Sequence, residues 1–369
     1  MLSTKSYAFI GFGLIGGSMA KRLKRLQDHC RITVCSRTRE KILPALEEGV
    51  VSHIADSVND PEILQADVIF LCTPVETIGS YLKDLSELLP KDSKAILTDV
   101  GSTKSRIMAE AASYGLQKHF IGAHPMAGSE RSGYAASKDS LLENAFYILT
   151  PFPETPEENI ETMKELASLF GAIPMVMDAE THDYSVAGIS HVPHLIAASL
   201  VELVRTHDDP QEIMKTIAAG GFKDITRIAS SSPEMWEQIC NSNQSAITSL
   251  LDEYISSLTK IREEVKAGNG QEIYDLFQRA GTYRNSISNR QSGPIAVEHS
   301  ITCDIEDEAG AIATIATLLA FKGISIKNIG IVHNRDGEEG VLKIEFRDEE
   351  SKEHAAEVLR SRSYTVFQR

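Results

Sequence analysis

The segment from Gly11 to Gly16, with the sequence Gly-Phe-Gly-Leu-Ile-Gly, constrains the fold more than any other part of the chain. It follows an apolar run at residues 7–10 and precedes a helical pattern that starts near Ser18. A strand, a glycine-rich turn and a helix N-terminus form the seat of a dinucleotide pyrophosphate, because glycine allows a tight turn and a close approach of backbone N–H groups. The contacts that we expect from this turn are Gly11, Gly13, Leu14, Ile15 and Gly16.

The composition is that of an acidic globular protein. Its 369 residues carry a formal net charge of −15 and are 42% hydrophobic. That charge argues against nucleic acid and anionic membranes as partners, and no apolar run is long enough to predict a membrane span. The five cysteines show neither CxxC nor paired spacing, so we expect reduced thiols, no metal site and a cytoplasmic location.

Three regions differ in pattern. Residues 1–178 alternate short apolar runs with helical patterns, which predicts a Rossmann-type α/β domain with a mainly parallel sheet. Residues 179–290 repeat apolar side chains at three- and four-residue spacing, which predicts an all-helical second domain. After a polar linker, residues 297–369 predict a ferredoxin-like β-α-β-β-α-β domain. The strands expected in the first region are residues 7–10, 32–35, 68–72, 95–99, 120–122 and 146–149.

The end of the second predicted strand bears on the choice of cofactor. A dinucleotide fold usually places an acidic residue there to bind the ribose hydroxyls of NAD, but this chain has Ser36 and Arg37. Arg37 can hold the 2′-phosphate of NADP, or it can stack on the adenine of either cofactor. NAD and NADP therefore both stay open. Thr73 and Pro74, after the third predicted strand, complete the expected cofactor contacts.

Two loops that follow predicted strands carry candidate catalytic residues. Ser102 lies after the strand at 95–99, at the sheet edge where ligands bind in open α/β sheets. Its hydroxyl can hydrogen-bond a substrate or a histidine, or simply cap the next helix. His124 follows the strand at 120–122. Oxidation of an alcohol by hydride loss needs an acceptor for the hydroxyl proton, and a neutral imidazole serves near pH 7, although a loop histidine is often an ordinary surface residue.

The helical region carries further polar candidates. His191 and His194 could suggest a metal pair, but no third ligand lies nearby, so we expect one of them to face a pocket. Lys223 and Arg227 are four residues apart, so a helix would project both cations from one face. Arg227 can grip a carboxylate with two hydrogen bonds, which suits a dicarboxylate ligand. Both cations could equally be solvated surface charges paired with nearby acids.

Taken together, these segments resemble the prephenate/arogenate dehydrogenase family of tyrosine biosynthesis, over nearly the whole chain. The tail resembles an ACT regulatory module. The resemblance implies oxidative decarboxylation of prephenate to 4-hydroxyphenylpyruvate, with hydride transfer to NAD or NADP. A helical second domain and an ACT-like tail both favour a homodimer. The motifs that carry it lie at residues 11–18 (GFGLIGGS), 99–104 (DVGSTK), 122–133, 143–151, 182–194 and 220–236.

The resemblance also implies roles for the matching residues. His124 accepts the hydrogen bond of the ring hydroxyl of prephenate, while Ser102 orients both groups and contacts the cofactor. Arg227 binds a substrate carboxylate. Glu130 and Asp183 match acids near the pocket mouth, where a pairing with Arg227 would gate access. The remaining substrate contacts that it implies are Ser190, His194, Lys223, Ser231 and Trp236.

In the tail, the resemblance implies an amino-acid site between two paired modules, built from a helix-start turn and a strand asparagine. Tyrosine is the expected ligand, because it is the end product, and feedback inhibition is the expected effect. The residues that match are Asp307, Ala309, Gly310, Asn328 and Ile329.

Two other interpretations stay open. Arogenate dehydrogenase acts on a substrate with an amine where prephenate has a keto group, and His194 near that end fits a keto acid better. A member of a different class, a cofactor-bound sensor, would report amino-acid levels through the tail without turnover. The joint presence of His124, Ser102 and Arg227 argues against the sensor.

Overall fold

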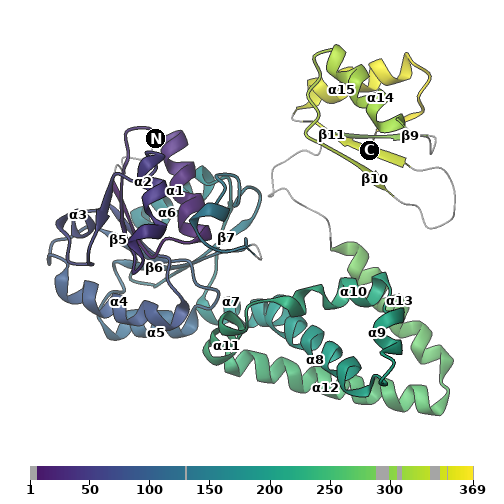
Figure 1. The fold of residues 1–369 in the computed structure, drawn as a ribbon, viewed down its shortest axis with the longest axis horizontal. Coiled ribbons are helices and arrows are strands. Elements are labelled where there is room, and N and C mark those ends of the chain that lie inside the picture. The colour runs from purple at the N-terminus through teal and green to yellow at the C-terminus, as the bar shows by residue number, and fades with distance from the viewer. Residues whose placement is uncertain are drawn as a thin grey trace. The chain divides into compact units, whose positions relative to one another are not determined.

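The computed structural model describes residues 6–128, 131–287, 299–305, 310–332, 341–346 and 348–368. The chain forms two compact units, Met1–Gln291 and Ser292–Arg369, whose elements are labelled in Figure 1. The first unit holds an α/β sheet domain followed by a helical region, and the second holds a small four-stranded sheet with two helices. Each unit has its own hydrophobic core.

An eight-stranded sheet forms the centre of the first unit, in the order β3-β2-β1-β4-β5-β6-β7-β8. Its strands are β1 (Ser6–Ile10), β2 (Arg31–Cys35), β3 (His53–Ala55), β4 (Val68–Leu71), β5 (Ile96–Asp99), β6 (Phe120–Pro125), β7 (Phe146–Pro151) and β8 (Ile173–Val176). Strands β1 to β6 are parallel, and β7 turns antiparallel to β6. The first six strands have the Rossmann order, with a switch point between β1 and β4 where a dinucleotide binds. The predicted Rossmann-type domain is confirmed.

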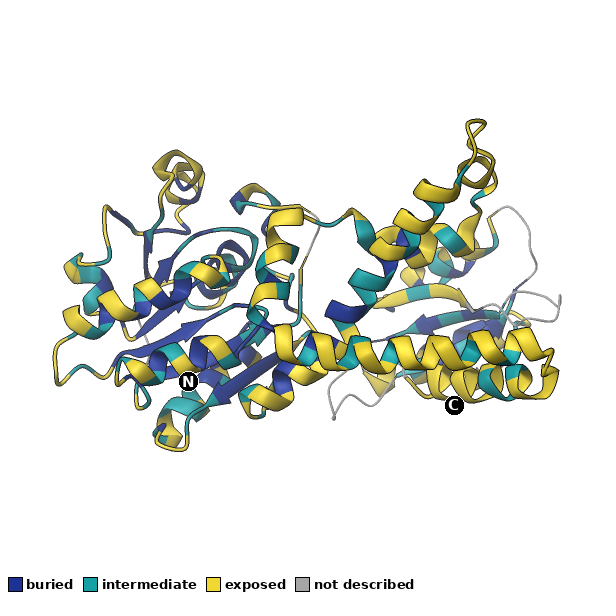
Figure 2. Cartoon of the chain, turned by 90° about the horizontal axis from the view of Figure 1, so that it is seen from below, coloured by how far each residue is buried: buried dark blue, intermediate teal, exposed yellow. Residues whose placement is uncertain are grey.

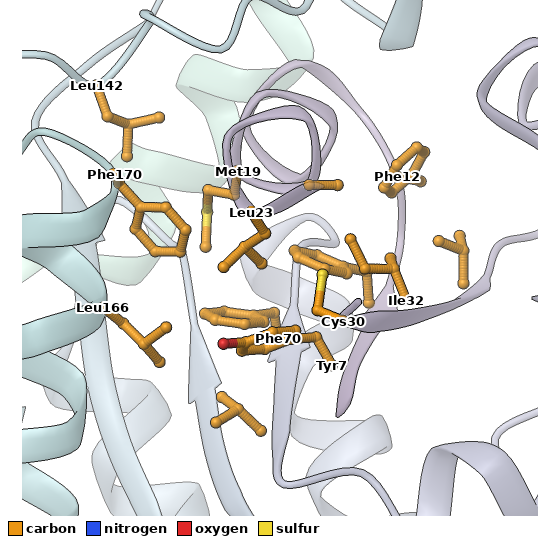
Figure 3. Packing of buried hydrophobic residues seen from close by; sticks show 14 of the residues in the cluster. Tyr7, Phe12, Met19, Leu23, Cys30, Ile32, Phe70, Leu142, Leu166 and Phe170 are labelled. Atoms are coloured by element: carbon orange, nitrogen blue, oxygen red, sulfur yellow. The ribbon is translucent and has the colours of Figure 1, made fainter. Parts of the chain in front are cut away.

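The central strands β1 and β4 are buried on both faces, which explains their near-continuous apolar runs. Tyr7 and Phe9 point into one core with Phe70, and Ala8 and Ile10 point into the other. Figure 3 shows the first of these cores, in which Phe9 and Phe70 stack with ring centroids 4.9 Å apart. Helices α1 (Leu14–Leu26), α2 (Leu43–Glu47) and α6 (Glu157–Leu169) cover that face, and α3 (Pro61–Leu64), α4 (Val75–Leu88) and α5 (Ser105–Ser113) cover the other. Two 3₁₀ turns, η1 (Arg39–Lys41) and η2 (Tyr134–Ala136), complete this domain.

The helical region follows β8, as predicted. Its elements are α7 (Ala179–Val186), η3 (Ala187–His191), α8 (Val192–His207), α9 (Ile213–Ile217), α10 (Gly220–Thr226), η4 (Arg227–Ser230), α11 (Pro233–Ser242), α12 (Gln244–Ala267) and α13 (Gly270–Ser286). Helices α7 and α8 are joined through η3, a π-helical turn, into one helix over Ala179–His207. By length and composition alone this is the one described helix that could cross a membrane. It carries the buried polar residues His182, Asp183 and His191.

The second unit has the predicted β-α-β-β-α-β order. Its elements are β9 (Ser300–Asp304), α14 (Ala311–Phe321), β10 (Asn328–Val332), β11 (Val341–Glu345), α15 (Glu349–Arg360) and β12 (Val366–Gln368). The antiparallel sheet has the order β10-β11-β9-β12, and side chains such as Ile301, Ile315 and Leu342 form its core. Of the residues expected to bind an amino acid, Gly310, Asn328 and Ile329 are described, whereas Asp307 and Ala309 lie outside the described residues.

Candidate active site

The glycine turn after β1 has the geometry that a dinucleotide requires. Gly11 has φ +82°, and a Cβ there would lie 2.6 Å from the carbonyl oxygen of Cys72, so glycine is needed at this position. A Cβ at Gly16 would lie 3.2 Å from the Cys72 sulfur, which shows how closely α1 packs on β4. Gly13, by contrast, has open space around it and begins α1 without a side-chain cap. The N-terminus of α1, with Leu14 and Ile15 in its first turn, is therefore open to an anion.

Thr73 supports this interpretation. Its Oγ1 is buried and has no hydrogen-bond partner among the described residues, and its methyl group lies next to Gly11. A buried hydroxyl without a partner is costly unless a ligand or water satisfies it. Pro74 follows at the start of α4, and Ser36 and Arg37 follow β2 beside the same turn. The residues present at this edge therefore fit a bound dinucleotide.

His124 lies at the carboxyl end of β6, on the same edge of the sheet. Its Nδ1 is 2.8 Å from Nε2 of His182, a residue of α7, and the two rings meet edge to face at 74°. Nδ1 of His182 is in turn 2.8 Å from Oδ1 of Asp183. His182 was not predicted as a site residue, although it lies within the 182–194 motif. Three side chains from two parts of the chain thus form one hydrogen-bonded row.

The electrostatics of this row keep His124 neutral. Burial lowers the pKa of His124 well below its usual value, and the neighbouring His182, Lys104 and His191 lower it further, against an opposite effect of Asp183. For Asp183, burial alone would raise the pKa of the carboxyl. Hydrogen bonds from His182, Ser105 and Lys104 outweigh burial and hold that pKa below its usual value. A neutral His124 and an ionised Asp183 carboxylate are therefore the stable forms at pH 7.

The position of Asp183 corrects the expectation that it lies at the pocket mouth. Asp183 is 4% exposed, and it accepts hydrogen bonds from the backbone N–H groups of Lys104 (2.7 Å) and Ser105 (2.8 Å). The N-terminus of α5 attracts a carboxylate, because its first N–H groups lack partners within the helix. Asp183 therefore holds His182 from inside the protein. Glu130, the other acid expected at the mouth, lies outside the described residues.

A buried ion pair fixes the strand that carries His124. The ammonium of Lys104 is fully buried; it contacts the Asp99 carboxylate and donates to the carbonyl of Ala123 at 2.8 Å. Asp99 also accepts the Ala123 N–H at 3.0 Å and the Gly101 N–H at 2.8 Å. Neither role was predicted, because Asp99 looked like the last residue of a strand and Lys104 like part of the loop that follows it. Ser102 is half-buried in that loop, and within the described part of the chain it makes no hydrogen bond with His124.

The helical region contributes a second group of polar residues. His194 stacks on Trp236 with ring centroids 4.0 Å apart, and its Nδ1 donates to the carbonyl of Ser190 at 2.7 Å. The Trp236 Nε1–H is buried and has no acceptor among the described residues. An indole donor without a partner is the kind of group that a carboxylate or carbonyl of a ligand satisfies.

His191 differs from His194. It is 2% exposed, its Nδ1 lies 3.2 Å from the Asn243 side-chain amide, and burial lowers its pKa to about 4. Asn243 also donates to the Asp183 carbonyl at 2.8 Å, so His191 belongs to the packed junction between α7 and α12. Of the two histidines, His194 is the more open to a ligand.

The remaining expected contacts lie around the end of α10. Lys223 is an exposed residue of α10, whereas Arg227 begins the 3₁₀ turn η4, so one continuous α-helix does not present both. Turn η4 packs on α8, the helix of His194. Ser231 follows η4, where its hydroxyl donates to the Ile228 carbonyl at 2.8 Å.

Two family descriptions match the chain in succession. "Prephenate dehydrogenase, nucleotide-binding domain" matches residues 19–175, and "Prephenate dehydrogenase, dimerization domain" matches residues 178–279. The chain belongs to the prephenate dehydrogenase family. It is 37% identical to a prephenate dehydrogenase of Bacillus subtilis, over 97% of this chain and 96% of that protein.

Solved structures of the same family share the fold of the first unit. The Aquifex aeolicus prephenate dehydrogenase, solved with hydroxyphenyl propionate and NAD+, has a TM-score of 0.73 and 31% identity and covers 78% of this chain and 99% of its own. A Synechocystis arogenate dehydrogenase has a TM-score of 0.69 and 28% identity and covers 77% of this chain and all of its own, 100%. The family thus includes enzymes named for either substrate.

Proposed function

We propose that this chain is an NAD-dependent prephenate dehydrogenase, which converts prephenate to 4-hydroxyphenylpyruvate and carbon dioxide in tyrosine biosynthesis. The observation that carries the proposal is the neutral His124, held by His182 at the same sheet edge as the glycine turn. Family membership supports the substrate class. The five cysteines are all free thiols, which suits a cytoplasmic enzyme.

In the proposed reaction, each residue at this edge of the sheet has a separate role. Bound NAD+ supplies the acceptor for the hydride that leaves the ring carbon of prephenate. The open N-terminus of α1 binds the pyrophosphate, and Thr73 offers its hydroxyl to the cofactor. His124 accepts the hydrogen bond of the ring hydroxyl, with Ser102 close by in the neighbouring loop, so that the oxygen can donate electrons as the hydride leaves. Loss of the ring carboxylate as carbon dioxide makes the ring aromatic and drives the step.

The other end of the substrate needs cationic and polar partners. We assign the carboxylates to Arg227 and Lys223, because a guanidinium binds a carboxylate through two parallel hydrogen bonds. Trp236 and His194 lie together and offer an unused indole N–H and a free imidazole nitrogen. We add Ser190, whose carbonyl accepts from His194, and Ser231 to this group on the family motif. On the family motif we propose that Glu130 pairs with Arg227 and gates access to this group.

One assay tests the proposal against its alternatives. The purified full-length chain is mixed with prephenate or arogenate, each with NAD or NADP, and the absorbance of the reduced nicotinamide is followed. Turnover of prephenate with NAD is the expected result. Turnover of arogenate only would assign the chain to the other substrate, a preference for NADP would assign Arg37 to the 2′-phosphate, and cofactor binding without any turnover would favour a sensor.

We also propose that the enzyme is a homodimer formed through the helical region. The matching family description names this region a dimerization domain. Helices α12 and α13 expose large apolar side chains on their surfaces, among them Ile255 (57%), Tyr274 (64%) and Phe277 (73%). Large apolar side chains that stay exposed on two long helices support a protein–protein contact there.

For the second unit we propose an ACT-type regulatory domain that binds tyrosine. Its β-α-β-β-α-β order and the turn at Gly310, where φ is +99°, support this, as does the placement of Asn328 and Ile329 at the start of β10. A chain truncated after residue 296 should keep its basal activity and lose its inhibition by tyrosine. Full inhibition of the truncated chain would place the tyrosine site elsewhere, for instance at the active site.

A further inference from the structure

We infer that His182 and Asp183 are positioning residues that fix the tautomer of His124. In that tautomer the Nε2 lone pair of His124 is left to accept the hydroxyl proton of the substrate. The identity of the substrate rests on the proposed function. The three side chains form a row with two hydrogen bonds of 2.8 Å each. Neither His182 nor this role for Asp183 follows from the motif that surrounds them.

Asp183 sets the donor and acceptor roles along the hydrogen-bonded row of Asp183, His182 and His124. Its carboxylate accepts two backbone N–H groups, from Lys104 and Ser105, and this keeps it ionised. An ionised carboxylate can only accept hydrogen bonds, so the proton between it and His182 belongs to Nδ1 of His182.

The donor and acceptor roles between His182 and His124 follow in the same way. A neutral imidazole has one N–H, so Nε2 of His182 holds a lone pair and accepts from Nδ1–H of His124. Nε2 of His124 is then the unprotonated nitrogen. The acceptor that the reaction needs is therefore specified by a carboxylate two side chains away.

The backbone anchors hold this row in one place. Lys104 joins three parts of the site: its N–H binds Asp183 of α7, and its ammonium binds Asp99 of β5 and the Ala123 carbonyl of β6. His124 follows Ala123 directly. A shift of α7 against β6 would break several buried hydrogen bonds together, so the spacing between the two imidazoles is rigid.

The proton balance of the reaction favours positioning over proton export. As the hydride leaves, the ring hydroxyl of prephenate transfers its proton toward Nε2 of His124. The electrons of the breaking bond to the carboxylate enter the ring, and the phenol oxygen takes the proton back. No net proton is released when prephenate gives hydride, carbon dioxide and 4-hydroxyphenylpyruvate. The row therefore needs only to stabilise a transient positive charge on His124, which the Asp183 carboxylate does through His182.

Two substitutions of His182 separate tautomer control from simple packing. In His182→Gln, the side-chain amide can still accept from His124 and donate to Asp183, whereas His182→Leu can do neither. We expect kcat with prephenate to fall roughly 10- to 100-fold in His182→Leu, because general base catalysis contributes about 10²- to 10⁴-fold and His124 itself remains. His182→Gln should recover most of this loss. His119 is the residue just before β6, far along the strand from His124, so His119→Leu is the matched control and should keep full activity.

The pH profile gives a readout that packing alone would not move. The groups acting on His124 are His182 and Asp183 from α7, His191 from η3 and Lys104 before α5. His124 works when neutral, so kcat/KM falls as the pH drops through its pKa, which lies well below the usual histidine value. Replacing His182 by glutamine removes one cause that lowers this pKa. The acid limb should therefore move to higher pH in His182→Gln and stay in place in His119→Leu.

A direct measurement does not depend on turnover. In the full-length chain labelled with ¹⁵N-histidine, with the His124 signals assigned by their loss in His124→Asn, we expect a protonated Nδ1 and an unprotonated Nε2. His182→Leu should lose this fixed form. An Nε2–H on His124 in the unsubstituted chain, or unchanged kcat and acid limb in His182→Leu, would overturn the inference. Absence of prephenate turnover in the unsubstituted chain would instead defeat the proposed function.

Discussion

The sheet domain and the helical region of the first unit differ in how many of their apolar side chains they bury. In the sheet domain, β1 and β4 are buried on both faces, and two cores hold aromatic and aliphatic side chains from six helices. In the helical region, the core cluster contains only Ala187, Val192 and Ile247 as buried residues. Figure 2 shows this contrast, with dark blue strands and long helices that are mostly yellow.

The contrast indicates which region is complete by itself. None of the described residues of α13 is buried, and α12 buries only Ile247. A helix gains most of its stability from packing its apolar face, so long helices without such packing need a partner. The sheet domain therefore supplies a rigid platform for His124, whereas the helical region leaves apolar side chains uncovered, as expected if the proposed homodimer forms through it.

The largest expected effect is on catalysis at the edge of the rigid platform. Since the proposed reaction needs a proton acceptor, His124→Asn should lower kcat with prephenate by about 10²- to 10⁴-fold. Steady-state kinetics measure this, and NAD affinity should barely change, because the glycine turn is intact. An unchanged kcat would remove His124 from the reaction.

The next effect tests how far the platform depends on its buried ion pair. Lys104→Met leaves the buried Asp99 carboxylate without its cation, so we expect the free energy of unfolding to fall by about 3–5 kcal/mol. Denaturant titration of the purified chain measures the change. Lys164→Met is the control, because it removes a solvent-screened pair with Glu161 and should change the free energy of unfolding far less. Equal effects for both variants would contradict the role given to the pair.

Local patterns in the sequence predicted the elements better than the contacts between them. All six expected strands are present, but β3 and β8 were missed, because they are only three and four residues long and β8 is not buried. His124 was found because it directly follows a strand, which is local information. Asp183 was misplaced because its partners Lys104 and Ser105 are 79 and 78 residues away along the chain. No pattern around Asp183 indicates that α7 turns this side toward the start of α5.

A smaller effect is expected where the helical region meets the substrate. Arg227→Ala should raise the KM for prephenate roughly 10- to 100-fold, because a charge-assisted hydrogen bond is worth about 1.5–3 kcal/mol, and should lower kcat much less. The same kinetics with Arg227→Lys should give an intermediate KM, since a lysine keeps the charge without the two-pronged geometry. A fall in kcat at constant KM would assign Arg227 to the reaction step instead of binding.

The smallest effect on the stability of the single chain is expected from a substitution on the exposed face of α13. The same substitution tests most directly whether the helical region, unlike the sheet domain, needs a second copy of the chain. Phe277 is 73% exposed, so Phe277→Ser should leave the folded chain about as stable as before. In a dimer the same side chain would be buried, and losing an aromatic contact at an interface costs about 2 kcal/mol or more, equivalent to a roughly 30-fold weaker dimer. Sedimentation over a range of concentrations measures this, with Leu88→Ser on α4 as the control, since Leu88 is also exposed (38%) but lies in the sheet domain. If both variants dimerise like the unsubstituted chain, the apolar face of α13 is not the contact, and the helical region must be stabilised through another surface.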